Sequence, residues 1–152
     1  MVRLVDCDPA LRQFLENYEC PDIDTEAWCP GPALTQRRVA LVSSAGLRRR
    51  DDHPFAVDAN DYRIIPLDKR NEVVQDHVSA MHDRTGYMED LNTILPLDRL
   101  LDLERAAEIG SVADYHYSFM GATDPTLMRP AVKRLASALK GDNVNALVLC
   151  PV

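Results

Sequence analysis

The chain has 152 residues, of which 46% are hydrophobic and 27% charged, a composition typical of a single globular domain. Its net charge of −7 argues against a nucleic-acid or anionic-membrane surface, because both need clustered lysine and arginine. No apolar stretch approaches the ~20 residues that span a bilayer, and the N-terminus lacks the pattern of a signal peptide. We therefore expect a cytoplasmic protein that binds neither nucleic acid nor membrane.

Residues 1–37 are predicted to form an N-terminal helix and an irregular arm over the domain proper, which spans residues 38–152. Asp8 is a good N-cap and Pro9 a good first residue for a helix that runs to about Tyr18. Proline and glycine then break the chain at positions 21, 30, 31 and 32. The four cysteines, at positions 7, 20, 29 and 150, match no zinc-binding spacing, and a disulfide framework is not expected in a cytoplasmic protein.

The first strand is predicted at residues 39–42, an uninterrupted apolar run of the kind that is covered on both faces. It leads into Ser43-Ser44-Ala45-Gly46, where small residues allow close approach to the backbone. Residues 47–60 are polar and indicate a loop. A second short strand follows at 62–66, where Pro66 stops it.

The middle of the chain is harder to interpret. Residues 71–81 have helical spacing of valines, and 82–86 resemble a turn. A helix is predicted from Pro96 to a stop at Gly110. Residues 111–123 are predicted to be a strand or extended segment that leads into a functional loop.

The last two elements are a helix and a strand. Leu127, Ala131, Leu135 and Leu139 have helical spacing, with Gly141 as the stop, and residues 145–149 form a buried type of strand. Alternating strands and helices predict an α/β fold with a mostly parallel sheet and helices on both faces. Ligands bind such sheets beyond the carboxyl ends of the strands, which here are Ser43–Gly46 and Cys150–Val152.

The ending of the chain is unusual, because a parallel strand is normally followed by a helix that covers the sheet. Two interpretations remain open from the residues alone. The protein is naturally short, with its last strand at the sheet edge, or the chain is a truncated product.

Three stretches resemble a known family: Val39–Gly46, the motif His116-Tyr117-Ser118-Phe119-Met120-Gly121, and the strand that runs into Cys150-Pro151-Val152. Two further stretches, 82–86 and 95–100, lie between them in the same order as in that family. Together they resemble the selenoprotein B family of glycine/sarcosine/betaine/D-proline reductases over about residues 36–152. In that family, Pro-Val is followed by selenocysteine or cysteine and then by a closing α/β unit.

The resemblance implies reductive cleavage of a carbon–nitrogen bond in a small amino-acid-derived substrate. A selenol suits this reaction because it is ionised near neutral pH, whereas a thiol has a pKa of about 8.5 and needs activation. We expect selenocysteine in a full-length product, no cofactor in the 152-residue chain, a sheet that lacks its C-terminal α/β unit, and no activity of this chain alone. The implied partners are a thiol or thioredoxin-like electron donor and a second reductase subunit.

The predicted catalytic residues are Cys150 and His116. Two residues separate Cys150 from the expected selenol position, and Cys150 could be a redox partner, although a small buried hydrophobe is an equal alternative. His116 could protonate a leaving amine, because the ordinary pKa of histidine lies near neutrality. The alternative is a hydrogen-bonded structural histidine.

Six further residues are assigned to substrate binding: Ser43, Ser44, Gly46, Arg84, Tyr117 and Ser118. The first three could present backbone N–H groups to an anion, or simply form a tight turn. Arg84 could bind a substrate carboxylate with both arms of its guanidinium, or take part in a surface salt bridge.

Two other functions stay open. One is a non-catalytic α/β subunit that binds a small anion or a partner. The other is a metal-dependent lyase or hydrolase that uses His77, His82 and His116, although a five-residue spacing is not that of two ligands on one helix face. A sheet that lacks its closing unit would expose apolar surface, so we expect a homo-oligomer.

Overall fold

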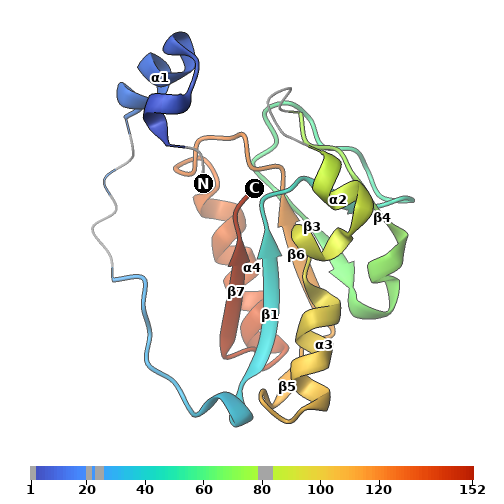
Figure 1. Cartoon of the computed structure of the whole chain (residues 1–152). Coiled ribbons are helices and arrows are strands. Elements are labelled where there is room, and N and C mark those ends of the chain that lie inside the picture. Colours follow the sequence, from blue (N-terminus) through green and yellow to red (C-terminus); the bar gives the residue numbers. More distant parts are fainter. Residues whose placement is uncertain (1–2, 20–21, 23–25, 79–83) are drawn as a thin grey trace.

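The computed structural model describes residues 3–19, 22, 26–78 and 84–152, and shows a curled sheet with helices on both faces (Figure 1). The central strand is β1 (Arg38–Ser43). On one side it pairs in parallel with β7 (Ala146–Cys150) along five residues. The mostly parallel α/β fold predicted from the sequence is therefore confirmed.

On its other side β1 has two successive partners. It pairs in parallel with β5 (Ser111–Val112) near its start and with β6 (Tyr115–Phe119) near its end. Strand β3 (Tyr62–Pro66) completes the sheet and runs antiparallel to β6. The edges of the main sheet are therefore formed by β3 and the short β5 on one side of β1 and by β7 on the other.

The predictions for residues 47–60 and 71–81 were wrong in part. The supposed loop starts as strand β2 (Leu47–Arg49), and the supposed helix contains strand β4 (Val73–Gln75), which pairs with it antiparallel. β-Branched valines favour an extended chain when a neighbouring strand is available. An ion pair from Arg48 to Asp76 joins the two segments.

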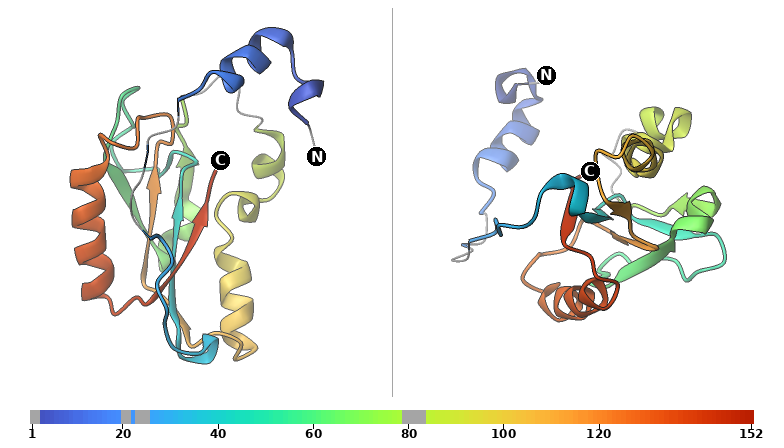
Figure 2. Two further views of the ribbon diagram at one scale, coloured as in Figure 1. Left: turned by 90° about the vertical axis from the view of Figure 1, so that its left-hand side faces the viewer. Right: turned by 90° about the horizontal axis from the view of Figure 1, so that it is seen from below.

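The two faces of the sheet are covered by different helices. Figure 2 shows α3 (Leu97–Arg105) on one side and α4 (Arg129–Gly141) on the other. Successive side chains of a strand point to opposite faces, so Val39 and Leu41 join the α3 core while Ala40 joins the α4 core. Helix α4 buries Ala131, Leu135 and Leu139 of the predicted stripe, and Pro130 lies in its first turn. The prediction was wrong for Leu127, which precedes the helix and is exposed.

Strand β7 is covered on one face only, so the prediction of a buried strand at residues 145–149 was wrong in part. Leu147 and Leu149 are 47% and 69% exposed on the face that α4 covers elsewhere. Ala146 and Val148, on the other face, pack against the α3 core.

Helix α3 ends before the predicted stop at Gly110. Ala107 adopts a left-handed φ of 56°, which breaks the helix three residues earlier. Two short elements, α2 (Thr85–Glu89) and the 3-10 turn η4 (Leu91–Thr93), precede α3. A further 3-10 segment, η3 (Leu67–Glu72), connects β3 to β4.

The N-terminal part stands apart from the sheet (Figure 1). The 3-10 turn η1 (Leu4–Asp6) is followed by α1 (Pro9–Glu16), where Asp8 accepts hydrogen bonds from Ala10 N at 2.9 Å and Leu11 N at 3.4 Å. This confirms the predicted cap. None of the side chains of α1 is buried, and the chain rejoins the domain through η2 (Leu34–Gln36).

Candidate functional site

The carboxyl ends of β1 and β7 meet at one edge of the sheet (Figure 1). Ser43 is paired with Cys150, and Ser44 N donates to Cys150 O at 3.1 Å. Proline has no N–H, so the ladder cannot continue through Pro151. The hydroxyl of Ser44 accepts a hydrogen bond from Val152 N at 2.9 Å instead. The predicted placement of Cys150–Val152 beside Ser43–Gly46 is confirmed.

Two glycines make this junction possible. Gly121 has a φ of 87°, and a Cβ at this position would lie 2.2 Å from Ser44 O. Gly46 has a φ of 64°, donates its N–H to Phe119 O at 2.8 Å, and has the backbone of His77 where a Cβ would be. Both positions require glycine, because an L side chain disfavours this backbone and finds no space. Gly121 belongs to the sequence motif but was not predicted as a site residue. The change to small residues after Met120 is the feature of the sequence that could have indicated it.

Arg84 is brought to the same edge from a distant part of the chain. Its Nη2 donates to His77 O at 2.9 Å, and Asp76 N donates to Gly46 O at 2.8 Å. The guanidinium thus lies near the Ser43–Gly46 turn. Its role with a substrate carboxylate stays a prediction.

The hydroxyl groups of two predicted substrate-binding residues are buried and already hydrogen-bonded within the fold. Ser118 Oγ accepts from Leu47 N at 2.9 Å and donates to Phe119 O at 3.2 Å. Ser43 Oγ accepts from Ala45 N at 3.2 Å. Tyr117 is buried in the α4 core, where its ring packs edge-on against Tyr62 at 5.5 Å. These contacts favour structural roles for all three residues.

His116 lies inside the sheet, where β1 passes from β5 to β6. Its ring has no solvent exposure, and its Nδ1 accepts a hydrogen bond from Leu41 N at 3.0 Å. Burial lowers the pKa of His116 to about 4, so the imidazole is neutral at pH 7. This arrangement favours the structural alternative that the sequence left open.

Cys150 is half-buried on the face of the sheet that α3 covers. Its Sγ lies 4.0 Å from Thr93 O, and burial raises the pKa of its thiol. A thiol of this kind is not activated as a nucleophile near neutral pH. Thr93 was not singled out from the sequence, since η4 follows a segment without clear periodicity.

The metal-site hypothesis was based partly on His82, which lies outside the described residues. Within the parts of the chain that the structure describes, no three histidine, cysteine or acidic side chains are grouped to hold a metal ion. His116 Nδ1 is already occupied by the Leu41 amide.

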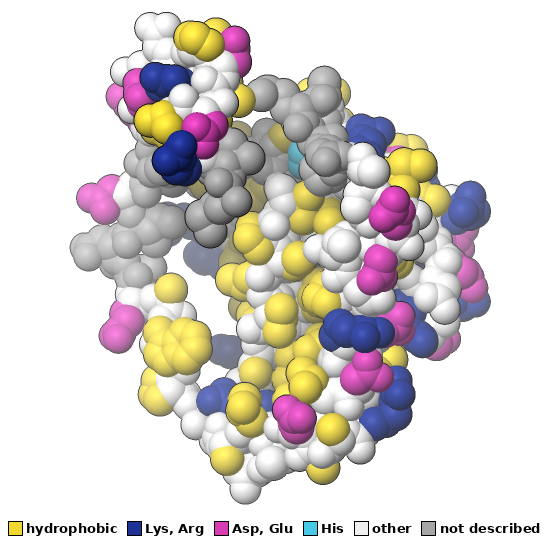
Figure 3. Space-filling model, viewed as in Figure 1, with side chains coloured by type: hydrophobic (Ala, Val, Ile, Leu, Met, Phe, Trp, Pro, Cys, Tyr) yellow, Lys and Arg dark blue, Asp and Glu magenta, His cyan; other side chains and the backbone are white. Residues whose placement is uncertain are grey.

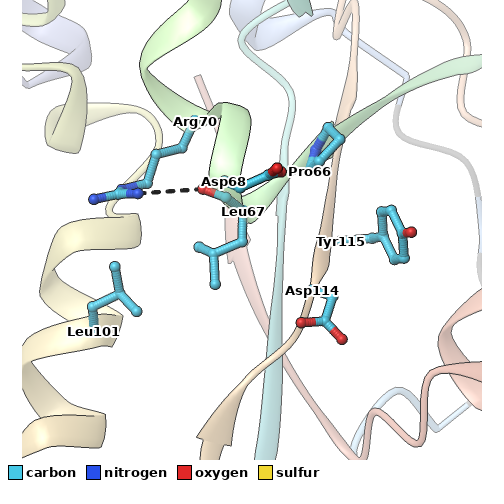
Figure 4. A pocket seen from close by; sticks show the side chains of 7 residues that line it. All are labelled: Pro66, Leu67, Asp68, Arg70, Leu101, Asp114 and Tyr115. Carbon is cyan, nitrogen blue, oxygen red and sulfur yellow. Dashed lines mark hydrogen bonds between the residues drawn. The ribbon is translucent and has the colours of Figure 1, made fainter.

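A pocket lies at the opposite end of β6 from Gly121. It has a volume of about 440 Å³ and is lined by residues that include Pro66, Tyr115 and Arg70 (Figure 4). Arg70 Nη1 donates to Leu67 O at 3.3 Å and its Nε pairs with Asp98 at 3.0 Å, so the cation has partners within the fold. The pocket does not coincide with the edge where the sequence motifs converge.

The structure defines an α/β protein whose candidate site is the carboxyl edge of a parallel strand pair. Comparison with known proteins agrees with this fold class and identifies the family. A family model described as "Glycine/sarcosine/betaine reductase selenoprotein B" matches residues 10–151. The chain belongs to this family, as the sequence motifs predicted.

The curated relatives are components of reductase complexes. The "Glycine reductase complex component B subunit gamma" of Symbiobacterium thermophilum is 28% identical over 145 residues, which are 90% of this chain and 33% of that protein. The "Sarcosine reductase complex component B subunit beta" of Peptoclostridium acidaminophilum is 29% identical over 146 residues, again 90% of this chain and 33% of that protein. The "D-proline reductase subunit gamma" of Acetoanaerobium sticklandii is 27% identical over 127 residues, 80% of this chain and 52% of that protein.

The chain thus spans about a third of the length of the first two of these relatives. No solved structure matches the chain significantly. Among the described residues, no helix is long and apolar enough to cross a membrane.

Proposed function

We propose that this chain provides the sheet-edge framework of a selenoprotein B-type reductase that acts in the cytoplasm. In this proposal a selenol or thiol follows Pro151-Val152 in a longer product and reductively cleaves a carbon–nitrogen bond of an amino-acid-derived substrate. The observation that carries the proposal is the β1–β7 ladder, because it delivers Val152 to Ser44 at the edge where α/β sheets bind ligands.

The chemistry would need two electrons. The selenolate forms a bond to the substrate carbon while the amine leaves with the electron pair of the C–N bond and takes up a proton. A thiol of the electron donor then attacks the selenium, so that the carbon leaves with the electron pair of the C–Se bond and takes up a proton, and a second donor thiol releases the selenolate. Two thiols of the electron donor become a disulfide. The residues of this chain would position the reacting group: Ser44 fixes the main chain of Val152, and Arg84 offers a cation for a substrate carboxylate.

Cys150 has a lesser part in this scheme than the residue expected after Val152. Its raised pKa keeps it as a thiol, which suits a resting redox partner better than an attacking nucleophile. A second subunit of the reductase would complete the substrate site, in line with relatives that are named as components of reductase complexes.

The proposal is tested on the gene and on its natural product. Nucleotides after the codon of Val152 should show an in-frame stop-type codon or a cysteine codon, followed by an open frame with a further cysteine codon. Cells grown with radioactive selenium should then carry label in a product longer than 152 residues. A natural product without selenium or cysteine after Val152 would leave the non-catalytic subunit as the better interpretation.

Activity gives the second test. The 152-residue chain with a dithiol donor should not reduce glycine, sarcosine, betaine or D-proline. Reduction by the short chain that is lost in Cys150→Ser would transfer the chemistry to Cys150 and overturn the proposal.

A further inference from the structure

The Ser43–Gly46 turn of the candidate site is held from outside the main sheet, by the two-stranded ribbon of β2 and β4. β2 leaves the turn directly after Gly46, and β4 brings the chain back to it. Asp76 N donates to Gly46 O at 2.8 Å, and a Cβ on Gly46 would lie 2.9 Å from the Cα and the N of His77. The backbone of these two residues therefore lies directly against the glycine of the turn.

An ion pair between Arg48 and Asp76 fixes the end of this ribbon. Arg48 lies opposite Val74 in the β2–β4 register, so Asp76 is its diagonal neighbour on the same face. Arg48 Nε contacts one carboxylate oxygen of Asp76, and Nη2 donates to the other at 3.5 Å. Arg48 Nη1 donates to the carbonyls of residues 49, 50 and 52 at 3.0, 3.2 and 3.1 Å. Each nitrogen of the guanidinium thus has an acceptor.

This pair is less exposed than its neighbour on the same strand. The side chains of Arg48 and Asp76 are 15% and 23% exposed, whereas those of Arg49 and Asp51 are 34% and 72% exposed. Figure 3 shows basic and acidic side chains interspersed along the margin of the molecule where β4 lies in Figure 1. Because water and salt screen exposed charges, the partly buried pair holds its geometry better than a surface pair. A ribbon of two three-residue strands needs such a link, since two strands alone are marginally stable.

Arg84 depends on the same short segment. Its Nη2 donates to His77 O at 2.9 Å, and His77 is next to Asp76 in the chain. The main chain of Arg84 is held separately, because its carbonyl accepts from Met88 N at 3.2 Å in the first turn of α2. The direction of the guanidinium therefore follows the His77 carbonyl, and the Asp76 carboxylate one residue away anchors that carbonyl.

We propose that Arg48 and Asp76 are positioning residues of the candidate site, whose ion pair holds the Arg84 guanidinium in the orientation that receives a substrate carboxylate. This inference rests on the proposed function, in which Arg84 binds that carboxylate. An arginine that becomes ordered only on binding weakens the complex, because its rotamer freedom is lost at that moment. The pair supplies the orientation before the substrate arrives, and neither of its members touches the substrate.

The first readout is the orientation of Arg84 in the 152-residue chain without a ligand. In NMR spectra of the nitrogen-labelled chain, the side-chain signals of Arg84 are identified by their loss in Arg84→Lys. The bond to His77 O slows rotation of the guanidinium, so we expect separate signals for its two Nη groups. Asp76→Ala should merge these signals. Asp76→Asn keeps the shape of the side chain without its charge and should shift them toward each other, which keeps the test decisive if Asp76→Ala disturbs the fold.

The second readout is the binding of betaine, measured by calorimetry, with choline as the matched ligand. Choline has the trimethylammonium group of betaine but a hydroxymethyl group in place of the carboxylate. The dissociation constant for betaine should rise about three- to tenfold in Asp76→Asn and in Arg48→Gln, because Arg84 then loses its orientation. It should rise about tenfold or more in Arg84→Lys, which cannot form the two-armed contact. Any binding of choline should be the same in all variants.

The matched control is Arg49→Gln, which removes the neighbouring arginine of β2 and its surface pair with Asp51. It should leave the Arg84 signals and betaine binding unchanged, and the amide signals of β1 and β7 report whether each variant keeps the main sheet. Arg84 signals that stay the same in both Asp76 variants overturn the proposal. An equal effect of Arg49→Gln also overturns it, because the ribbon as a whole would then be responsible.

Failure of the proposed function gives a different result. Arg84 signals that respond to the Asp76 variants, in a chain that does not bind betaine, would overturn the carboxylate role of Arg84 on which the proposal rests. They would not overturn the link between the ion pair and the orientation of Arg84.

Discussion

Leu41 N donates its hydrogen bond to a side chain, His116 Nδ1 at 3.0 Å, and not to the backbone of the neighbouring strand. β1 pairs with β5 through Val39 and with β6 from Val42 onwards, so residue 41 lies at the change of partner. The imidazole fills a gap in the ladder. A buried N–H without an acceptor is costly, which gives this histidine a role in stability that does not depend on catalysis.

His116→Ala should therefore lower the free energy of unfolding by about 2–4 kcal/mol, because it leaves the Leu41 amide unpaired and creates a cavity. His116→Asn keeps an acceptor near the position of Nδ1 and should lose less. Urea denaturation of the three proteins measures both effects. Equal losses for Ala and Asn would show that the hydrogen bond is not what the ring contributes.

The same residue should make stability depend on pH. Its pKa is about 4 in the folded protein and near 6.5 when exposed, so the unfolded chain binds more protons between these values. Stability should consequently fall by roughly 3 kcal/mol as the pH decreases from 7 to 4, in addition to the contribution of other groups. The difference between the unaltered protein and His116→Asn across this range isolates the effect; parallel curves would contradict it.

Ser44→Ala should loosen the end of β7 without unfolding the sheet. The variant removes the acceptor for Val152 N, while the ladder from Val39 to Ser43 is unchanged. We expect faster hydrogen exchange in a peptide that covers residues 145–152 and a global loss of about 1 kcal/mol or less. Ser137→Ala, which removes a hydroxyl bonded to Lys133 O on the surface of α4, is the matched control.

Gly121→Ala should be strongly destabilising, by about 2 kcal/mol or more, because the new methyl group meets Ser44 O and the residue has a positive φ. Gly141→Ala provides the contrast, since nothing lies within 4 Å of the added Cβ at the end of α4. That change should be neutral or slightly stabilising. Thermal unfolding of the two variants side by side measures the destabilisation that crowding at Ser44 causes.

Cys150 should react slowly with iodoacetamide at pH 7. Burial raises the pKa of this thiol, whereas Cys29 is exposed on the arm. Peptide mapping over a time course should show modification of Cys29 first, with Cys150 slower by about tenfold or more. A Cys150 that reacts as fast as Cys29 would indicate an activated thiol and strengthen its assignment as a catalytic residue.

The hydrophobic pattern of the sequence was sufficient to predict the elements that form the core of the sheet and pack on it. The stripe of Ala131, Leu135 and Leu139 predicted α4, and the apolar runs predicted β1 and β7 with their carboxyl ends together. Periodicity identifies such elements because burial on a single face fixes which positions are apolar. The short segments β2 and β4 were missed because each is stabilised by the other across a distance in sequence, and three residues are too few to show a period.

The sequence by itself determined the family, the α/β class and the edge at which the family motifs converge, because motif order and hydrophobic spacing are local properties of the chain. Only the tertiary structure decided what each motif residue does. His116, Tyr117 and Ser118 stand together in one motif, yet the first completes a ladder, the second fills the α4 core and the third accepts from Leu47 N. Adjacent side chains of a strand point to opposite faces and meet different neighbours, so their roles depend on contacts that no spacing along the chain encodes.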